Sequence, residues 1–373
     1  MKNKIHNYDF LVVGSGLIGS LVALNLLKNK YKVLIVDKSK NLSKDDRTLA
    51  VNANSKDFLI GLGLWSKLKS NPQPIKRIEI KDTINKTPLF FEDPSEEMGN
   101  VIMNKDVLVE SRNILSKKKI LITGIDLDVS LIKPNQKIEI KNKKYVFNKV
   151  ILSLGKNYQD NKNIKKFSFP SSHKSFVGFF RHSVMHKQVA YEIFTPNGPL
   201  AVLPAPDKSK KKSTFIYSSK KKVNHHQIKN LIEKYFSSTH GLINFNSGIF
   251  EYNISPHISK DKYNNFILLG DTLRSIHPVA GQGWNLGIKD IQTLISLLNI
   301  NGINDPHLLK KFYDRRVLEN FSYLSFTSLI NYLYENNNIL SGPIIKSGFA
   351  ILKESDLLRN AFIKQAMGRL KLI

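Results

Sequence analysis

The sequence predicts an α/β fold, in which a Rossmann-like domain is interleaved with an antiparallel-sheet domain and followed by a helical C-terminal tail. Three observations predict this fold class. Gly14, Gly16 and Gly19 form a glycine-rich turn between a buried strand and a helix. Runs rich in aromatic and β-branched residues, which favour strands, fill residues 167–250. After Gly287 the pattern is mostly helical.

Length and composition limit the possible functions. With 373 residues and 41% apolar residues, the chain can bury the core of two domains or of one interleaved unit. It contains no Cys, which excludes disulfides, thiolate metal sites and thiol catalysis. His225-His226 lacks the spacing and the third ligand of a metal site. We therefore expect no metal centre, and we expect these two histidines to lie on the surface.

The chain is strongly basic, with a formal net charge of +27 that comes mainly from Lys. It carries no nucleic-acid-binding motif, so we expect no nucleic acid partner. Near an anionic membrane, each well-placed Lys or Arg contributes about 1 kcal/mol, so peripheral membrane contact is the better-supported expectation. No run of 18 apolar residues could span a bilayer. The expected location is cytoplasmic, with peripheral contact to the inner membrane.

The first motif lies near the N-terminus. Residues 8–13 predict a buried strand, and the turn GSGLIG leads into a helix that ends near Leu27. A second strand over residues 32–36 ends at Asp37, where a carboxylate suits a ribose hydroxyl. The alternative is a glycine-rich packing turn. The candidate dinucleotide-binding residues are Gly14, Gly16, Leu17, Ile18, Gly19, Asp37 and Lys38.

The next segments alternate between helical and extended patterns. Residues 46–68 predict a helix with Arg47 near its start, and residues 104–115 predict another. Alternation over residues 74–91 predicts strands of a second sheet. The stretches that follow predict a small β meander: 120–122, 137–140 and 146–154.

An antiparallel sheet is expected in the middle of the chain, over the runs 176–180, 190–194, 200–203 and 214–217. One face of this sheet could form the wall of an apolar pocket, although these aromatic residues could also be ordinary core. The Lys-rich runs 208–212 and 220–222 are expected in hairpin loops. Near the C-terminus, the apolar residues 339–352 either close the pocket, dip into a membrane interface, or pack in the core.

Residues 270–290, GDTLRSIHPVAGQGWNLGIKD, form the second motif. A buried strand over residues 266–269 ends at Gly270-Asp271, which places a carboxylate at the carboxyl end of the strand. Gly281-Gln282-Gly283 then opens a helix from about Trp284 to Leu298. A glycine-lined helix start presents unpaired N–H groups and a positive dipole end, so it suits a ligand that carries or develops negative charge.

The residue pattern of this second motif resembles a FAD signature of the aromatic-ring flavoprotein monooxygenases, specifically the ubiquinone-biosynthesis hydroxylases. Four other segments are similar to that family in the same order: 47–50, 62–65, 194–204 and 313–316. The resemblance covers most of the chain. It implies a p-hydroxybenzoate hydroxylase-like fold that uses FAD, with NAD(P)H as transient electron donor and oxygen as co-substrate. The implied reaction hydroxylates the ring of a polyprenylated phenol or quinone intermediate.

The resemblance also implies a division of the chain and roles for particular residues. Residues 1–73, 95–160 and 255–305 would form the FAD-binding domain, residues 74–94 and 161–254 the substrate domain, and residues 306–373 the C-terminal helical segment. Arg47 would lie beside the flavin ring and ribityl chain, Asp271 at the ribityl or pyrophosphate region, and Pro278 against the ring. Backbone donors of Gly281, Gln282 and Gly283 would face the pyrimidine edge, with Gly270 and Asn285 completing the cofactor-binding set. No catalytic residue is assigned.

Two departures from the family pattern keep alternatives open. Residues 152–157 lack the Asp-Gly motif that the family uses for the cofactor and the nicotinamide donor. Thr272-Leu273-Arg274 replaces Ala-Ala-His, and Arg274 is expected to pair with the pyrophosphate. The alternatives are a flavoprotein that acts on another isoprenoid lipid, as a reductase or cyclase, and a noncatalytic FAD-binding member of a quinone-biosynthesis complex.

Overall fold

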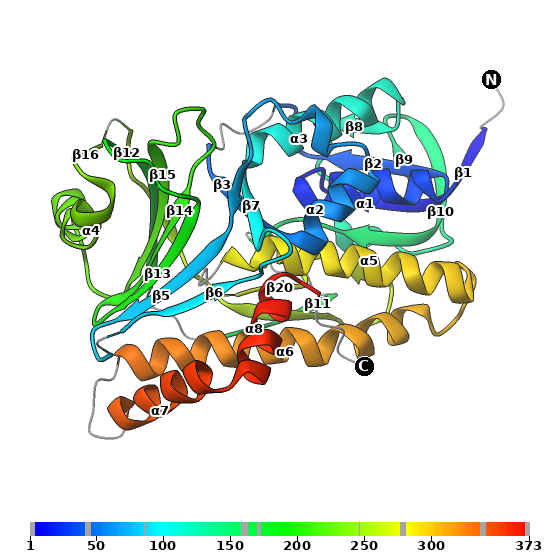
Figure 1. Ribbon diagram of the computed structural model, residues 1–373. Coiled ribbons are helices and arrows are strands. Elements are labelled where there is room, and N and C mark those ends of the chain that lie inside the picture. Colours follow the sequence, from blue (N-terminus) through cyan, green and yellow to red (C-terminus); the bar gives the residue numbers. More distant parts are fainter. Residues whose placement is uncertain are drawn as a thin grey trace.

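The computed structural model describes residues 4–41, 46–85, 87–156, 158, 163–169, 173–245, 247–276, 281–335 and 341–369, without the side chains of residues 326, 327, 331 and 335. A lobe built on a parallel sheet lies on one side of the molecule and a large antiparallel sheet on the other (Figure 1). Three C-terminal helices run beneath both parts (Figure 1). This arrangement agrees with the predicted fold class.

The helices alternate with the strands in the first half of the chain and dominate its end. They are α1 (Leu17–Lys28), α2 (Ala53–Gly61), α3 (Asn104–Lys117), α4 (His225–His240), α5 (Gly283–Asn301), α6 (Leu308–Glu335), α7 (Ser341–Glu354) and α8 (Asp356–Ala366), with short 3-10 turns η1 (Trp65–Lys67), η2 (Val129–Leu131) and η3 (Gly270–Thr272). The helix that was predicted from about Trp284 is α5. Among the described residues, no helix is both long and apolar enough to cross a bilayer.

The parallel sheet is the core of the first lobe. Its strands, in spatial order, are β19 (Phe266–Leu268), β10 (Lys143–Leu152), β1 (Ile5–Val13), β2 (Val33–Asp37) and β8 (Leu121–Thr123), and β9 (Ile138–Ile140) pairs antiparallel with β10. The unit β1-α1-β2 is the predicted strand, helix and strand. Phe10, Leu11 and Val12 are completely buried, as expected for a strand covered on both faces.

The register of this sheet brings its loops to one edge. Val13 lies opposite both Leu152 and Val36, and Leu152 lies opposite Leu268. The chain therefore leaves β1, β10 and β19 at the same carboxyl edge, which is where open α/β sheets bind ligands. Both sequence motifs begin at this edge, although more than 200 residues separate them.

Two secondary-structure predictions were wrong. Residues 48–52 are not helical: β3 (Thr48–Asn52) pairs with β7 (Gly99–Met103), which also pairs with β4 (Gln73–Ile75), because pairing with β7 overrides the local helical pattern. The helix begins only after Asn52, whose side chain accepts from the Ser55 N–H. The predicted meander is also wrong, since β8 and β10 lie in the parallel sheet and only β9 and β10 form an antiparallel pair.

The predicted antiparallel sheet is present and its two faces differ. It contains, in order, β16 (Ile243–Asn244), β12 (Lys174–His182), β15 (Lys212–Ser219), β14 (Gly198–Pro204), β13 (Val189–Thr195), β5 (Arg77–Asp82) and β6 (Leu89–Glu92), and β17 (Phe250–Asn253) pairs with β12. Tyr191 and Ile193 face α4 and pack with Phe236. Because strand side chains alternate, Glu192 and Phe194 face the other way.

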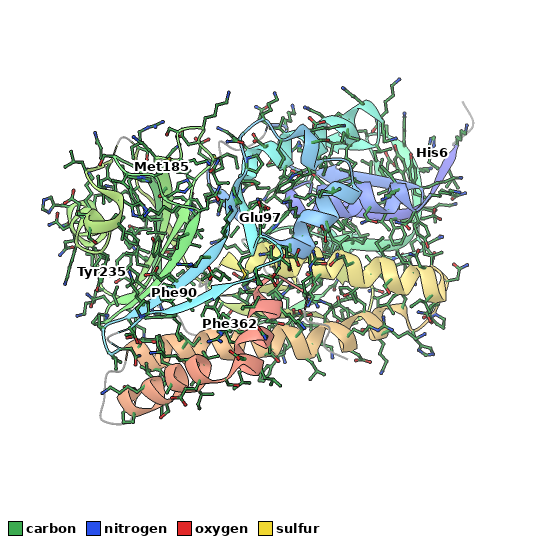
Figure 2. All side chains as sticks on the ribbon, viewed as in Figure 1. His6, Phe90, Glu97, Met185, Tyr235 and Phe362 are labelled. Atoms are coloured by element: carbon green, nitrogen blue, oxygen red, sulfur yellow. The ribbon has the colours of Figure 1, made fainter. Side chains whose placement is uncertain are left out.

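The remaining elements close the structure around the sheets. A small sheet joins β11 (Ile164–Ser168), β18 (His257–Asp261) and β20 (Arg274–Ser275). Figure 2 shows Phe362 on α8 and Phe90 on the neighbouring β6. The ring centroid of Phe362 lies 4.5 Å from that of Phe91, the next residue of β6. Residues 208–211 and 220–222 are exposed on both sides of β15, as predicted for loops, and His225-His226 is exposed as predicted.

Three buried histidines meet where β12 and α4 end. The ring centroid of His182 lies 4.6 Å from that of His240 and 6.1 Å from that of His186. His182 is hydrogen bonded to the Val184 carbonyl and the Ser213 hydroxyl. Burial lowers the pKa of His186 to about 4 and that of His240 to about 3, and neighbouring histidines add to both shifts. All three rings are therefore neutral at pH 7 in the folded protein.

This cluster predicts a loss of stability in mild acid. The folded pKa lies below the unfolded value of about 6.5, so the stabilisation is complete above pH about 6.5 and falls as the pH drops toward 4. At pH 5 the loss is about 2 kcal/mol for each strongly shifted histidine. We expect His240→Leu to reduce the difference in the free energy of unfolding between pH 7 and pH 5 by about that amount, as measured by urea denaturation.

The matched control is His226→Leu, which replaces an exposed histidine on the same helix. It is expected to keep the pH dependence of the unsubstituted protein. An unchanged pH dependence in the His240→Leu variant would contradict the prediction.

Candidate functional site

The two glycine-bearing motifs meet at the side chain of Ile18. A Cβ atom added at Gly287 would lie 2.6 Å from Cδ1 of Ile18, and one added at Gly270 would lie 3.0 Å from Cγ1. Gly270 also has a φ of +60°, which disfavours any other residue. The glycines thus let η3 and the first turns of α5 pack directly against the start of α1. The two motifs, far apart in the sequence, therefore meet in the fold.

Gly14 and Gly19 serve this packing as well. Gly14 has a φ of +98°, and a Cβ there would lie 2.2 Å from the Ser153 carbonyl oxygen. A Cβ at Gly19 would lie 1.9 Å from the Gly14 carbonyl oxygen. Gly16 differs from both, because a Cβ there would meet nothing within 4 Å. Because Gly16 has no side chain, the space above the start of α1 is open. No neighbouring segment packs into it.

That space is part of a polar cavity of about 480 Å³. Its wall is formed by both motifs and by the loops after β10 and β17, through Gly16, Leu17, Ile18, Arg47, Lys156, Tyr252, Gly270, Asp271, Gly281, Gly283 and Trp284, among others. The helices α1 and α5 both begin here, and neither start is capped by a side chain. Their first N–H groups and positive dipole ends suit a phosphate or another anion.

Charged side chains add to this potential. The Arg47 guanidinium lies 5.1 Å from the centroid of the Tyr252 ring, and the Lys156 ammonium lies 6.0 Å from it. Lys156 also donates to the Asn253 carbonyl at 3.1 Å. Desolvation lowers the pKa of Lys156, and desolvation raises the pKa of Asp271 although nearby cations oppose that shift. The cavity thus presents two cations and one carboxylate.

Arg274 does not reach this cavity, so the expectation that it pairs with a pyrophosphate is wrong. Its guanidinium is buried and donates to the Asp290 carboxylate at 2.6 Å. Asp290 also accepts from the Gly270 N–H at 3.1 Å and from Nε of Arg316 at 2.8 Å. A buried guanidinium requires a buried carboxylate, and Asp290 supplies it beneath η3. Arg274 therefore supports the loop from behind.

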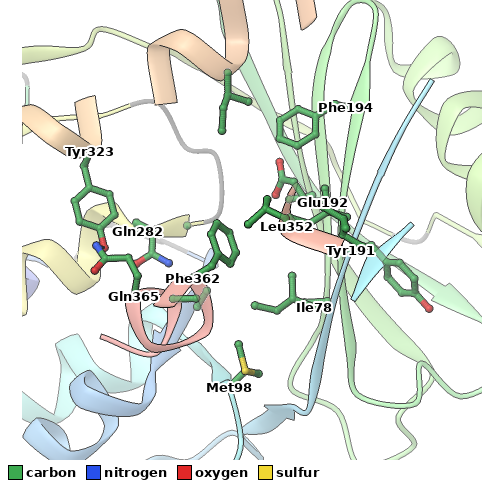
Figure 3. A pocket seen from close by; sticks show the side chains of 18 of the residues that line it. Ile78, Met98, Tyr191, Glu192, Phe194, Gln282, Tyr323, Leu352, Phe362 and Gln365 are labelled. Carbon is green, nitrogen blue, oxygen red and sulfur yellow. The ribbon is translucent and has the colours of Figure 1, made fainter. Parts of the chain in front are cut away.

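A second, apolar cavity of about 730 Å³ lies between the antiparallel sheet and the C-terminal helices (Figure 3). Ile78, Ile80 and Phe194 come from the sheet, and Leu352 and Phe362 come from α7 and α8. Thus α7, part of the predicted segment 339–352, covers the pocket. The Phe194 ring stacks on that of Tyr334 with centroids 4.3 Å apart, and the Tyr334 hydroxyl donates to Asp82 at 2.7 Å.

The two cavities share part of their walls. Ala50, Leu203, Ile216 and Gly281 line both of them. Gly281 has a φ of +60°, and a Cβ there would lie 3.2 Å from Cβ of Ala50. The junction therefore lies at the second motif. An extended ligand that starts above α1 and passes Asp271 would present its far end to the apolar cavity.

The predicted site residues fall into four groups. Eight of them line the polar cavity: Gly16, Leu17, Ile18, Arg47, Gly270, Asp271, Gly281 and Gly283. Gln282 and Asn285 line the apolar cavity, where Asn285 binds the backbone of Ala50 and Asn52. Four of them line neither cavity: Gly14, Gly19, Asp37 and Lys38. The Asp37 carboxylate instead accepts hydrogen bonds from the Ser15 N–H and hydroxyl. Pro278 lies outside the described residues, as does His277.

Several cavity residues were not identified from the sequence. Lys156 could have been found, because it follows a strand that ends at the same edge as β1. Trp284 could also have been found, because it follows Gly283 in the second motif. Tyr252 and Glu192 carry no local signal, since tertiary packing brings them to the cavities. Nε1 of Trp284 is buried at the polar cavity and has no hydrogen-bond partner within the described residues. Those residues also contain no group of His, Asp and Glu that could hold a metal ion.

These features fit FAD, and Gly16 provides a test. Its backbone has φ −64° and ψ −171°, an extended conformation that Val adopts readily. We expect Gly16→Val to leave the melting temperature of the FAD-free protein unchanged and to weaken FAD binding at least about tenfold, because the new side chain occupies the cavity. Fluorescence titration of the FAD-free protein measures the affinity.

Gly248→Val is the matched control, since Gly248 is exposed and a Cβ there also meets nothing within 4 Å. It is expected to bind FAD as the unsubstituted protein does. Equal FAD affinity of the two variants would show that the space above Gly16 does not hold the cofactor.

Comparisons with known proteins agree with this site. Residues 7–118 match the family model described as FAD binding domain. The chain is 24% identical to the ubiquinone hydroxylase UbiL of Rhodospirillum rubrum, over 98% of this chain and 90% of the relative. It is also 24% identical to the 3-demethoxyubiquinol 3-hydroxylase of Escherichia coli, over 96% of this chain and 98% of the relative.

Solved structures show the same fold. The p-nitrophenol 4-monooxygenase PnpA of Pseudomonas putida matches with a TM-score of 0.75 at 13% identity, over 98% of this chain and 100% of that one. The flavin-dependent brominase Bmp2 matches with a TM-score of 0.71 at 12% identity, over 97% and 94%. The predicted resemblance is therefore confirmed: residues 7–118 match the FAD binding domain model, the fold is that of a solved monooxygenase, and the chain is similar along almost its whole length to ubiquinone hydroxylases.

Proposed function

We propose that this protein is an FAD-dependent monooxygenase of ubiquinone biosynthesis, which hydroxylates the ring of a polyprenylated phenol or quinone precursor with NAD(P)H and oxygen. One observation carries the proposal: a polar cavity that suits FAD adjoins an apolar cavity that suits a lipid-tailed ring, and Gly281 is part of the wall of both. The relatives named as ubiquinone hydroxylases support this substrate class.

The proposal assigns roles to both cavities. FAD, when bound, supplies the redox chemistry that activates oxygen. The start of α1 would hold its phosphates, with Arg47 and Lys156 adding positive charge. The backbone at Gly281 and Gly283 would donate to the far end of the cofactor, where fixed donors stabilise negative charge without reorganisation. The apolar walls would hold the substrate ring at the junction and exclude water from it.

Oxygen uptake tests the reaction. We expect the FAD-loaded protein, given NAD(P)H and a prenylated phenol, to consume oxygen in step with hydroxylated product, measured with an oxygen electrode and by mass spectrometry. Ala201→Phe should lower this rate at least about tenfold while FAD binding stays unchanged, because Ala201 lines the apolar cavity and does not line the polar one. Product without oxygen uptake would indicate a reductase or cyclase, and FAD that NAD(P)H never reduces would indicate a noncatalytic member of a biosynthetic complex.

We also propose that the face formed by α6 and α7 contacts the membrane. Leu329 and Ile344 both line the apolar cavity and are each 55% exposed at its rim. On α7, Ile351 is exposed one heptad after Ile344, with the exposed Lys346 and Lys353 nearby. Apolar side chains with adjacent cations suit an anionic lipid surface. A polyprenyl tail could then pass from the bilayer into the cavity.

Vesicle flotation tests the membrane contact. We expect the protein to bind vesicles of phosphatidylcholine with 30% phosphatidylglycerol, and added salt to weaken this binding, because part of it is electrostatic. The double substitution Ile344→Glu with Ile351→Glu should weaken binding at least about tenfold. Leu131→Glu is the control, since Leu131 is 75% exposed but lies in η2. Equal binding by the double variant and the unsubstituted protein would contradict the proposal.

A further inference from the structure

One residue that lines the apolar cavity, Glu192, differs chemically from the rest of the wall. Among the described residues that line it, Glu192 is the only Asp, Glu, Lys, Arg or His. Its side chain is buried, with 7% of the residue exposed. A carboxyl group has more hydrogen-bond acceptor positions than any other side chain that lines this cavity. It therefore gives an otherwise apolar wall a place where a hydroxyl of a ligand can bind.

The strand register places Glu192 close to the junction of the cavities. Glu192 lies opposite Ala201 of β14, and Ala201 lies opposite Ile216 of β15. All three line the apolar cavity, and Ile216 lines the polar cavity too. Neighbouring strands are about 4.8 Å apart, so the Glu192 and Ile216 backbones are separated by about 10 Å. A ring held between them lies within reach of both the carboxylate and the junction.

The orientation of the side chain agrees with this position. The Glu192 carboxylate points into the cavity, whereas the neighbouring Tyr191 ring extends toward the opposite side of the sheet (Figure 3). Of the other polar groups nearby, Tyr334 donates to Asp82 and Asn285 binds the backbone of β3. The Gln365 amide N–H donates to Tyr323, and its carbonyl oxygen has no hydrogen-bond partner within the described residues. A carboxylate offers about four acceptor positions, so contacts of Glu192 with the protein leave capacity for a ligand.

We propose that Glu192 accepts a hydrogen bond from a ring hydroxyl of the substrate and thereby selects phenols and fixes which ring edge faces the junction. The inference rests on the proposed function and adds to it a specificity-determining contact. A carboxyl oxygen can accept a hydrogen bond from a ring hydroxyl, whereas an aryl ether has no hydrogen to donate. A site built to bind a hydroxyl discriminates strongly against analogues that lack it.

Binding without turnover tests the proposal. The probes are 2-geranylphenol and its methyl ether, titrated by isothermal calorimetry into the FAD-loaded protein without NAD(P)H. We expect the phenol to bind at least about tenfold more tightly than the ether, which is the range of a hydrogen bond to a charged group. Glu192→Leu should bind both probes alike. Should this variant fail to fold, Glu192→Gln, which keeps the shape but removes the charge, should lower the preference at least about threefold.

Glu79→Gln is the matched control, because it makes the same change on the adjacent strand β5 at a residue that lines neither cavity. It should keep the preference for the phenol. Equal binding of both probes by the unsubstituted protein, or a preference that survives in the Glu192 variants, would overturn the role of Glu192 and leave the proposed function intact. Binding of neither probe by the unsubstituted protein would overturn both.

Discussion

The contact of Ile18 with Gly270 and Gly287 is the interaction on which the site depends. It joins two segments that lie far apart in the chain, and it requires that neither glycine carries a side chain. Because the contact is close, the starts of α1 and α5 open into one cavity. A larger residue at either glycine would force Ile18 aside and separate the motifs. The unusual density of glycine in both motifs therefore has a packing cause as well as a binding cause.

Buried ion pairs beneath η3 stabilise the packing of the two motifs. Asp290 binds the Gly270 N–H, Arg274 and Arg316, so one carboxylate connects η3, α5 and α6. In the same region, the Tyr313 hydroxyl binds the backbone of Phe266 and Leu268 at the edge of the parallel sheet. The segment 313–316, which resembles the ubiquinone-biosynthesis hydroxylases, thus secures the second motif structurally. Arg274, which differs from the residue that the family pattern has at this position, belongs to the same network.

The antiparallel sheet separates two environments. One face packs against α4 in a dense aromatic core that ends at the histidine cluster, and the other face forms the wall of the apolar cavity. Because side chains alternate along β13, Tyr191 and Ile193 lie on the first face, whereas Glu192 and Phe194 lie on the second. A shift of register by one residue would exchange these side chains. The pairings of β13 with β5 and β14 therefore decide which residues meet the ligand.

The sequence by itself determined the fold class, both glycine motifs and eight of the residues that line the polar cavity, because strand, turn and helix signals are local and glycine spacing is specific. It also indicated the antiparallel sheet, but it left open whether residues 339–352 close the pocket, dip into a membrane interface or pack in the core. Tertiary structure decided what depends on distant pairing. Residues 48–52 became a strand because β7 lies beside them, and Arg274 turned away from the cavity because Asp290 lies behind it. Glu192 reached the apolar cavity through sheet register, which no local pattern encodes.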